Sequence, residues 1–290
     1  MLASARKIFE SQSTNQSQRP FSISMVRAGT QLLRVGRKAG SGSGLPLLMF
    51  NGLGGNIELV EPFARMVRRE LIIFDLPGVG HSPLPRRPYR MKDIALLAAQ
   101  VLEHFGHRQC DTLGVSWGGA AAQQFARSHS DRCRRLVLCA TATGALMVPA
   151  RPAVLLKMAT PARFISQEYA DRVAGDIYGG DFRRDPRLAK EVFQHVRWQS
   201  RLGYYLQLAA GAGWTSIHWL RALKQPTLVM AGVDDPIVPL VNARLMCRLI
   251  PNAELKVFDC GHLFLLTRAE ASARAIEEFL SRPEPRERTC

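Results

Sequence analysis

Hydrophobic runs long enough to cross a membrane are missing from this sequence of 290 residues, and so is the apolar core of a secretory signal. Its apolar stretches have the length of a β-strand, as at residues 45–50 and 136–140, whereas a membrane-spanning helix needs about 20 such residues. Arg6 and Lys7 are not followed by the apolar segment that a secretory signal requires. We therefore expect no transmembrane segment, and we interpret the polar residues 1–20 as a disordered leader.

Cysteine and acidic residues are also scarce. The 6 cysteines include no CxxC pair, so we expect reduced thiols in a cytoplasmic protein rather than a disulfide scaffold. The Asp and Glu residues number 24 against 39 Lys and Arg, and the formal net charge is +15. Such an excess of positive charge gives information on binding partners and not on the fold. The partner could be nucleic acid, an anionic surface or an acidic ligand. Because the basic residues are scattered along the chain, we expect no specific nucleic-acid partner.

The sequence motifs of metal and nucleotide sites are missing as well. His, Cys and Asp do not cluster at the spacing of metal ligands, and no GxGxxG follows the first predicted strand. The glycine-rich segment at residues 51–56 lacks the Gly-Lys-Ser/Thr ending of a phosphate-binding loop. We therefore expect neither a metal nor a cofactor.

What the sequence does contain is an alternation of strand-like and helix-like segments. Apolar runs predict strands at residues 45–50, 71–80, 112–115, 134–141, 226–233 and 253–259, and helical spacing predicts helices at 56–70, 91–105, 117–128, 241–250 and 269–280. This alternation is typical of a parallel sheet with helices on both faces.

The alternation stops between residues 144 and 222. That segment has helical patches, many aromatic residues and no clear strand. We therefore predict an α/β core made of residues 21–143 and 223–282, with a mainly helical insertion at residues 144–222 and a frayed tail at 283–290.

One pentapeptide carries a chemical signal. Residues 114–118 read Gly-Val-Ser-Trp-Gly, a G-x-S-x-G motif placed after a predicted strand and at the start of a predicted helix. This sharp turn strains the backbone of Ser116 and lifts its side chain off the sheet, and it needs small neighbours such as Gly114 and Gly118. Ser116 is therefore the candidate nucleophile.

A serine nucleophile needs a base, and the base needs an orienting acid. In folds built on this motif, the acid and then the histidine follow the serine along the chain. His262, in the turn after the last predicted strand, is the candidate base among the 7 histidines. Asp235 is the candidate acid and Asp234 its alternative, whereas Asp259 is interpreted as structural.

Other histidines fit the base less well. His81 lies in a glycine-rich turn and is a candidate for lining the site, and His195 and His218 lie in the insertion. The remaining three, at helix ends, are interpreted as surface residues: His104, His107 and His129.

Hydrolysis of an acyl group by a serine nucleophile also needs an oxyanion hole, that is, backbone N–H groups that bind the charged oxygen of the tetrahedral intermediate. The residue after the nucleophile, Trp117, supplies one N–H. The glycine-rich loop after the first core strand supplies the other, and Leu53 is the candidate, because its glycine neighbours allow close approach.

Six segments carry a resemblance to a known family. They are residues 47–63, 74–83, 114–126, 177–186, 203–220 and 259–271. From Phe21 to Leu280 the chain resembles an α/β-hydrolase, and more narrowly an intracellular poly(3-hydroxyalkanoate) depolymerase of the medium-chain-length type. The two segments inside the insertion are the more specific ones, because insertions vary freely between hydrolase families.

The resemblance implies a fold and an activity. The fold is a mostly parallel sheet flanked by helices, with the insertion as a helical lid. The activity is that of a serine esterase that hydrolyses stored polyester. The resemblance places this activity in the cytoplasm, on polyester granules. Proteins of the granule surface are further candidate partners. The family's nucleophile, acid and base fall on Ser116, Asp235 and His262. The lid aromatics proposed to bind substrate are Tyr204, Tyr205, Trp214 and Trp219.

Alternative functions remain open at this point. A small-molecule esterase, thioesterase or C–C hydrolase would use the same three residues. A polymer synthase typically has Cys at the position of Ser116, and a dehalogenase has a carboxylate there, so both are disfavoured. A non-catalytic protein that binds granules or nucleic acid is the remote alternative, which the basic charge alone would support.

Overall fold

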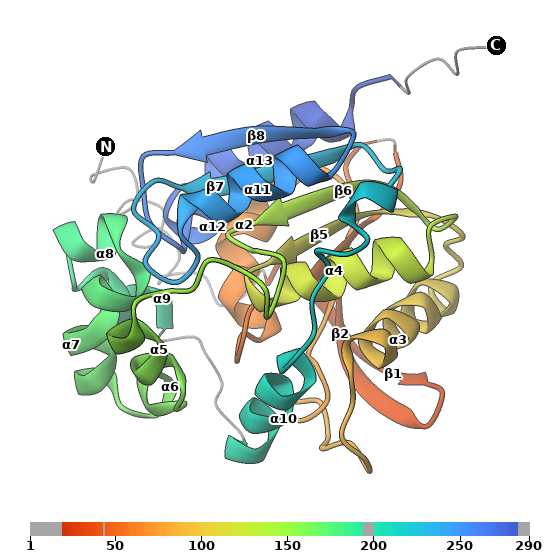
Figure 1. The fold of residues 1–290 in the computed structure, drawn as a ribbon. Helices are drawn as coiled ribbons and strands as arrows, with labels where there is room; N and C mark the ends of the chain where they lie inside the picture. Colours follow the sequence, from red (N-terminus) through yellow and green to blue (C-terminus); the bar gives the residue numbers. More distant parts are fainter. Residues whose placement is uncertain (1–18, 43, 194–199, 284–290) are drawn as a thin grey trace.

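The computed structural model describes residues 19–42, 44–193 and 200–283. Nearly all of the predicted leader, most of the predicted tail and His195 lie outside these residues. At the centre is an eight-stranded sheet in the order β1-β2-β4-β3-β5-β6-β7-β8 (Figure 1). The strands are β1 Ser22–Ala28, β2 Gln31–Lys38, β3 Leu47–Phe50, β4 Leu71–Phe74, β5 Cys110–Val115, β6 Cys133–Cys139, β7 Thr227–Gly232 and β8 Ala253–Phe258.

The sheet is mostly parallel, as predicted. All neighbours from β4 through β8 pair in parallel, whereas β1 and β2 form an antiparallel hairpin that joins the edge of β4. The apolar runs of the sequence did not predict these two strands. Gly29, with φ of 56°, makes the tight turn between the two hairpin strands.

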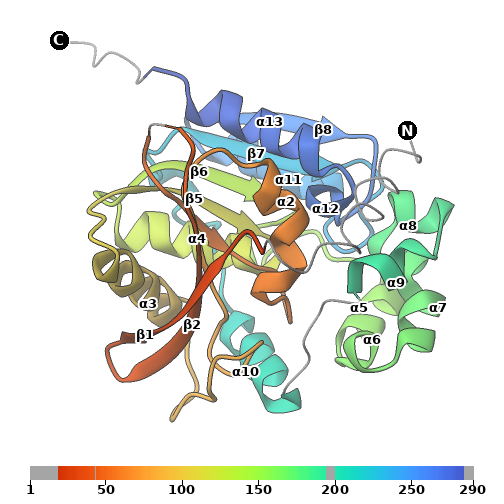
Figure 2. The same cartoon turned by 180° about the vertical axis from the view of Figure 1, so that it is seen from behind.

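Helices cover both faces of the sheet. Those of the core are η1 Ile57–Val60, α2 Glu61–Met66, α3 Met91–His104, α4 Trp117–Ser128, α11 Leu240–Leu249, α12 Phe264–Thr267 and α13 Ala269–Leu280. The first apolar cluster joins one face of the sheet to α3, α4 and α11. The second joins the other face to α2, α12 and α13, which are nearest the viewer in Figure 2.

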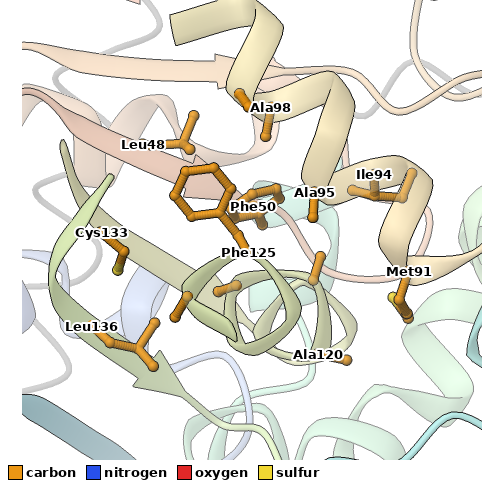
Figure 3. Close-up of a cluster of buried hydrophobic side chains, with 14 of the residues drawn as sticks. Leu48, Phe50, Met91, Ile94, Ala95, Ala98, Ala120, Phe125, Cys133 and Leu136 are labelled. Atoms are coloured by element: carbon orange, nitrogen blue, oxygen red, sulfur yellow. The ribbon is translucent and has the colours of Figure 1, made fainter. Parts of the chain in front are cut away.

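Strand β3 shows why its sequence is apolar throughout. Leu48 and Phe50 enter the first cluster and Leu47 and Met49 the second, so alternate side chains go to opposite faces. All four residues are at most 3% exposed. In Figure 3, Leu48 and Phe50 lie beside α3 and α4, with Phe125 against them. A strand buried on both faces reads as a continuous apolar run, as predicted for a parallel sheet.

The inserted segment lies between β6 and β7. Its described helices are α5 Pro152–Met158, α6 Ala162–Ile165, α7 Gln167–Tyr178, α8 Gly180–Arg184, α9 Leu188–Phe193, α10 Arg201–Gly211 and η2 Leu220–Ala222. Helices α5–α9 lie beyond the carboxyl ends of β6, β7 and β8 (Figure 1). A third apolar cluster packs α7–α9 onto Leu266 of α12, so this group of helices is anchored to the core.

Candidate active site

The turn between β5 and α4 holds the serine side chain at the carboxyl edge of the sheet. Ser116 has φ of 53° and ψ of −120°, a conformation that L-residues rarely adopt. A Cβ on Gly114 would lie 2.4 Å from the Gly118 carbonyl oxygen, and one on Gly118 would lie 2.3 Å from that of Phe50. The two glycines are therefore required by close packing, as the motif predicted.

Ser116 is joined to His262 and Asp235 by two hydrogen bonds. Nε2 of His262 lies 2.9 Å from Oγ of Ser116, and Nδ1 lies 2.7 Å from Oδ2 of Asp235. The second aspartate oxygen accepts the backbone N–H groups of Ile237 and Val238, each at 2.9 Å. The imidazole and its acid are buried, so both are held in one orientation. This arrangement allows His262 to take a proton from Ser116 while Asp235 stabilises the resulting imidazolium.

The other candidate acids point elsewhere. The Asp234 carboxylate accepts the Gly180 N–H at 2.7 Å and the Arg183 guanidinium at 2.6 Å. Burial pushes the pKa of Asp234 upward, but these two donors outweigh it and hold the pKa below its usual value. Asp259 is exposed and lies 3.6 Å from Arg184. Of the three aspartates considered, only Asp235 meets the imidazole.

The remaining described histidines do not border the cavities at Ser116. His81 is exposed, and its backbone N–H donates to Asp75 at 3.0 Å, so the prediction that it lines the site is not met. The others are exposed or half-buried: His104, His107, His129 and His218.

A nearby cysteine offers no competing nucleophile. Cys260 precedes His262 by two positions, but burial raises the pKa of its thiol to about 12. The thiolate is the reactive form of cysteine, so a thiol with that pKa is inert near neutral pH.

The two proposed oxyanion donors flank Ser116. A Cβ on Gly52 would lie 3.6 Å from Cβ of Ser116, so the loop that carries Leu53 runs beside the nucleophile. Within the described residues, the backbone N–H groups of Leu53 and Trp117 donate to no protein acceptor. Both remain available for the oxygen of a bound substrate.

Helix α10 contacts both sides of this oxyanion site through one residue. Gln207 is buried. Its side-chain Oε1 accepts the Gly54 N–H at 2.9 Å, and its main-chain carbonyl oxygen accepts the Trp117 indole N–H at 3.1 Å. Gly54 directly follows Leu53. Gln207 therefore links the loop after β3 to the start of α4.

Two cavities meet at Ser116. The larger, of about 450 Å³, is bordered by apolar side chains that include Met91, Leu208 and Trp214. The smaller, of about 60 Å³, also borders His262 and is lined in part by the inserted segment, through Arg163, Phe164 and Tyr178 among others. The residues common to both walls are Leu53, Ser116, Met158 and Ile237.

The four aromatic residues predicted to bind substrate take different places. Trp214 borders the larger cavity, and Trp219 packs behind it with ring centroids 6.0 Å apart. Tyr204 is buried within the inserted segment, where its hydroxyl bonds Arg163 and Met158, and Tyr205 is exposed. Of the four, Trp214 alone borders one of the two cavities, because the other three side chains point into packing contacts or outward.

Three polar residues at the site were not anticipated from the sequence. Arg163 and Tyr178 border the smaller cavity, and Gln207 lies behind the oxyanion site. The one available signal was Gln207, a lone amide within the apolar stretch 203–214. Arg163 reaches the site through the folding of the inserted segment, for which the local sequence gives no rule.

In the part of the chain that the structure describes, no three His, Cys, Asp or Glu side chains gather as a metal-ligand set. Among the same residues, no helix combines the length and apolar character needed to span a bilayer.

A strained serine after a parallel strand, with a histidine and an aspartate from later turns, defines a class of fold. The chain belongs to the alpha/beta hydrolase fold family, which matches residues 46–269. The chain is 50% identical over 269 residues to a poly(3-hydroxyalkanoate) depolymerase of Ectopseudomonas oleovorans, an alignment that covers 92% of this chain and 95% of that protein.

More distant relatives have the same architecture. A 2-hydroxymuconate semialdehyde hydrolase of Pseudomonas putida is 30% identical over 87% of this chain and 94% of its own length. The solved structure of a thermophilic esterase from Thermogutta terrifontis superposes with a TM-score of 0.72 at 24% identity, over 90% of this chain and 97% of that one. At this identity the structural likeness indicates the fold alone.

Proposed function

We propose that this protein is a serine esterase that hydrolyses the ester bonds of poly(3-hydroxyalkanoate), of the medium-chain type, with Ser116, His262 and Asp235 as its catalytic residues. The observation that carries the substrate class is the 50% identity, over 92% of the chain, to a protein named for this activity. The observation that supports the chemistry is the pair of hydrogen bonds joining the three side chains.

The reaction proceeds through an acyl-enzyme. Oγ of Ser116 attacks the ester carbonyl carbon while Nε2 of His262 takes the hydroxyl proton. The N–H groups of Leu53 and Trp117 bind the oxyanion of the tetrahedral intermediate. When the C–O bond breaks, His262 returns the proton to the leaving alcohol. Water, deprotonated by the same imidazole, then releases the acid and regenerates the Ser116 hydroxyl.

The larger cavity supports a substrate with long alkyl side chains. Its walls are apolar, with Met91, Leu208 and Trp214 among them, and its volume is about 450 Å³. A cavity of this kind favours alkyl groups through the hydrophobic effect. We propose that residues 144–222 act as a lid over the site and that Trp214 contacts the alkyl chains. The protein would act in the cytoplasm, at the surface of polyester granules.

Purified protein incubated with isolated granules tests this proposal. We expect release of 3-hydroxy acids or short oligomers, measured by mass spectrometry, from granules of medium-chain polyester, and much less from granules of the short-chain polymer. Rapid hydrolysis of small esters or thioesters with no release from either granule would instead identify a small-molecule hydrolase. The 30% identity to a 2-hydroxymuconate semialdehyde hydrolase makes that second outcome a concrete alternative.

A further inference from the structure

The smaller cavity contains a buried arginine that the ester chemistry does not use. Arg163, in α6, borders this cavity together with Ser116 and His262. The residue is only 3% exposed. Its guanidinium stacks on the Phe164 ring at 4.4 Å and lies 5.5 Å from the centre of the Tyr204 ring.

The hydrogen-bond partners of this guanidinium are all uncharged. One terminal nitrogen donates to the Thr160 carbonyl at 3.2 Å and to the Tyr204 hydroxyl at 3.0 Å. The Tyr178 hydroxyl is a further partner. Nε, although buried, has no acceptor among the residues that the structure describes. No carboxylate of the described residues forms an ion pair with Arg163, in contrast to the buried Arg34, which pairs with Glu58 and Asp75.

A buried guanidinium without a counter-ion is unusual. Arginine keeps its charge at any physiological pH, and burying a charge is costly unless it is paired. Hydrogen bonds to neutral phenols and one carbonyl offset only part of the cost of burying this charge. The cavity therefore favours an anionic group, and the fork of N–H donors suits a carboxylate.

A polyester of 3-hydroxy acids carries a carboxylate at one end only. The ester oxygen of the terminal unit is bonded to its C3, and the free carboxylate is C1, so one CH2 group separates the carboxylate carbon from C3. The smaller cavity has room for only a few water-sized groups, which matches a carboxymethyl end. Ser116 and Arg163 border this same small space. A terminal ester at Ser116 would therefore place its carboxylate near Arg163.

We infer that Arg163 binds the terminal carboxylate of the polyester chain, so that the enzyme removes units from the carboxyl end. This inference rests on the proposed function. Ser116 attacks the last ester carbonyl, the bond from that carbon to the C3 oxygen of the terminal unit breaks, and His262 protonates the released oxygen. The product is a free 3-hydroxy acid. The shortened chain stays on Ser116 until water releases it with a new terminal carboxylate.

A defined oligomer tests the inference. The substrates are a trimer of 3-hydroxyoctanoate and the same trimer with its terminal carboxyl converted to a primary amide. Charge-assisted hydrogen bonds predict that wild-type kcat/KM is about 10- to 100-fold higher for the acid than for the amide. With an isotope label in the carboxyl-terminal unit, the labelled monomer should be released first.

Variants assign the preference to Arg163. Arg163→Met should abolish the preference, so that kcat/KM for the acid falls to near that of the amide measured in the same variant, and Arg163→Lys should restore part of the preference. The matched control is Arg172→Met, which removes an exposed arginine of α7 and should keep the full preference.

A second measurement does not depend on how the variants fold. Free 3-hydroxyoctanoate should inhibit wild-type hydrolysis of a neutral p-nitrophenyl ester competitively, and at least 10-fold more strongly than its amide. Equal kcat/KM values for acid and amide, or equal inhibition by the two monomers, would overturn the role of Arg163 while the esterase function stands. Failure to hydrolyse either trimer or any granule would instead overturn the proposed function.

Discussion

At the scale of the residue, two adjacent aspartates have different partners. Asp235 accepts the imidazole of His262, whereas Asp234 binds Arg183 and the backbone of the inserted segment. The sequence indicated Asp235 as the acid and left Asp234 as an alternative. The two aspartates differ in the direction of their side chains, because consecutive side chains leave the backbone on different sides.

The first prediction concerns this pair. Asp235→Asn should reduce kcat by about 10⁴-fold, because an amide holds His262 in the wrong tautomer and leaves the imidazolium unstabilised. The measurement is the hydrolysis of a small p-nitrophenyl ester and of granules. Asp234→Asn is the matched control and should keep kcat within a few-fold of wild type. A larger loss in Asp234→Asn than in Asp235→Asn would refute the assignment.

The site residues differ in how many neighbouring residues of the sequence are needed to predict them. Ser116 could be found from five consecutive residues, and Leu53 and Trp117 follow from where a strand ends and a helix begins. Arg163 could not, because its place depends on how the short helices of the inserted segment pack against one another. Tyr204 shows the converse limit, since its aromatic character suggested a substrate contact and the structure buries it.

At the scale of the element, helix α10 holds the oxyanion site together. Gln207 connects the loop that carries Leu53 with the indole of Trp117 through two hydrogen bonds. Neither bond involves the reacting atoms, so Gln207 acts as a positioning residue. Its side-chain amide holds the loop that carries Leu53, and a well-placed Leu53 N–H would stabilise the oxyanion of the transition state.

The second prediction follows from that position. Gln207→Leu removes the acceptor of the Gly54 N–H and keeps the main-chain carbonyl that binds the Trp117 indole. It should lower kcat by about 10- to 100-fold with a smaller change in KM, because a misplaced Leu53 N–H weakens binding of the transition state more than that of the substrate. Steady-state kinetics on a soluble ester give both constants. Gln167→Leu, at an exposed position of α7, is the control and should leave kcat unchanged. An unchanged kcat in Gln207→Leu would show that the loop keeps its place without α10.

Long periodic elements could be predicted and short ones could not. The helices at residues 117–128 and 269–280 begin and end where their spacing indicated. The helix predicted at residues 56–70 ends at Met66, because Val67 is already extended and Glu70 bonds Leu47 of the sheet. Helices of four to seven residues, such as α6 and α5, are too short for a periodic signal.

At the scale of the whole molecule, the charge is the most unusual property. The formal net charge is +15. Several buried arginines are committed to internal ion pairs, as Arg69 is to Asp111 and Glu277. The excess belongs to the molecule as a whole rather than to one motif, so its effect is on long-range attraction to anionic surfaces.

The third prediction concerns that attraction. Binding to granules with an anionic coat should weaken several-fold when the salt concentration rises from about 50 to 500 mM, because the Debye length falls from roughly 14 to 4 Å. Sedimentation of granules with bound protein measures it. Hydrolysis of a neutral soluble ester in the same buffers is the control and should change little. Binding that does not respond to salt would indicate that apolar contacts, rather than charge, hold the protein on the granule.

The proposed mechanism depends on Ser116 as the nucleophile of a polyester hydrolase. The most direct measurement is the rate of 3-hydroxy acid release from medium-chain polyester granules by Ser116→Ala, with Ser130→Ala as the matched exposed control and thermal unfolding to verify that both variants fold. We expect a loss of roughly 10⁶-fold for Ser116→Ala and wild-type release for Ser130→Ala. Release by folded Ser116→Ala at a rate near wild type would show that Ser116 is not the nucleophile.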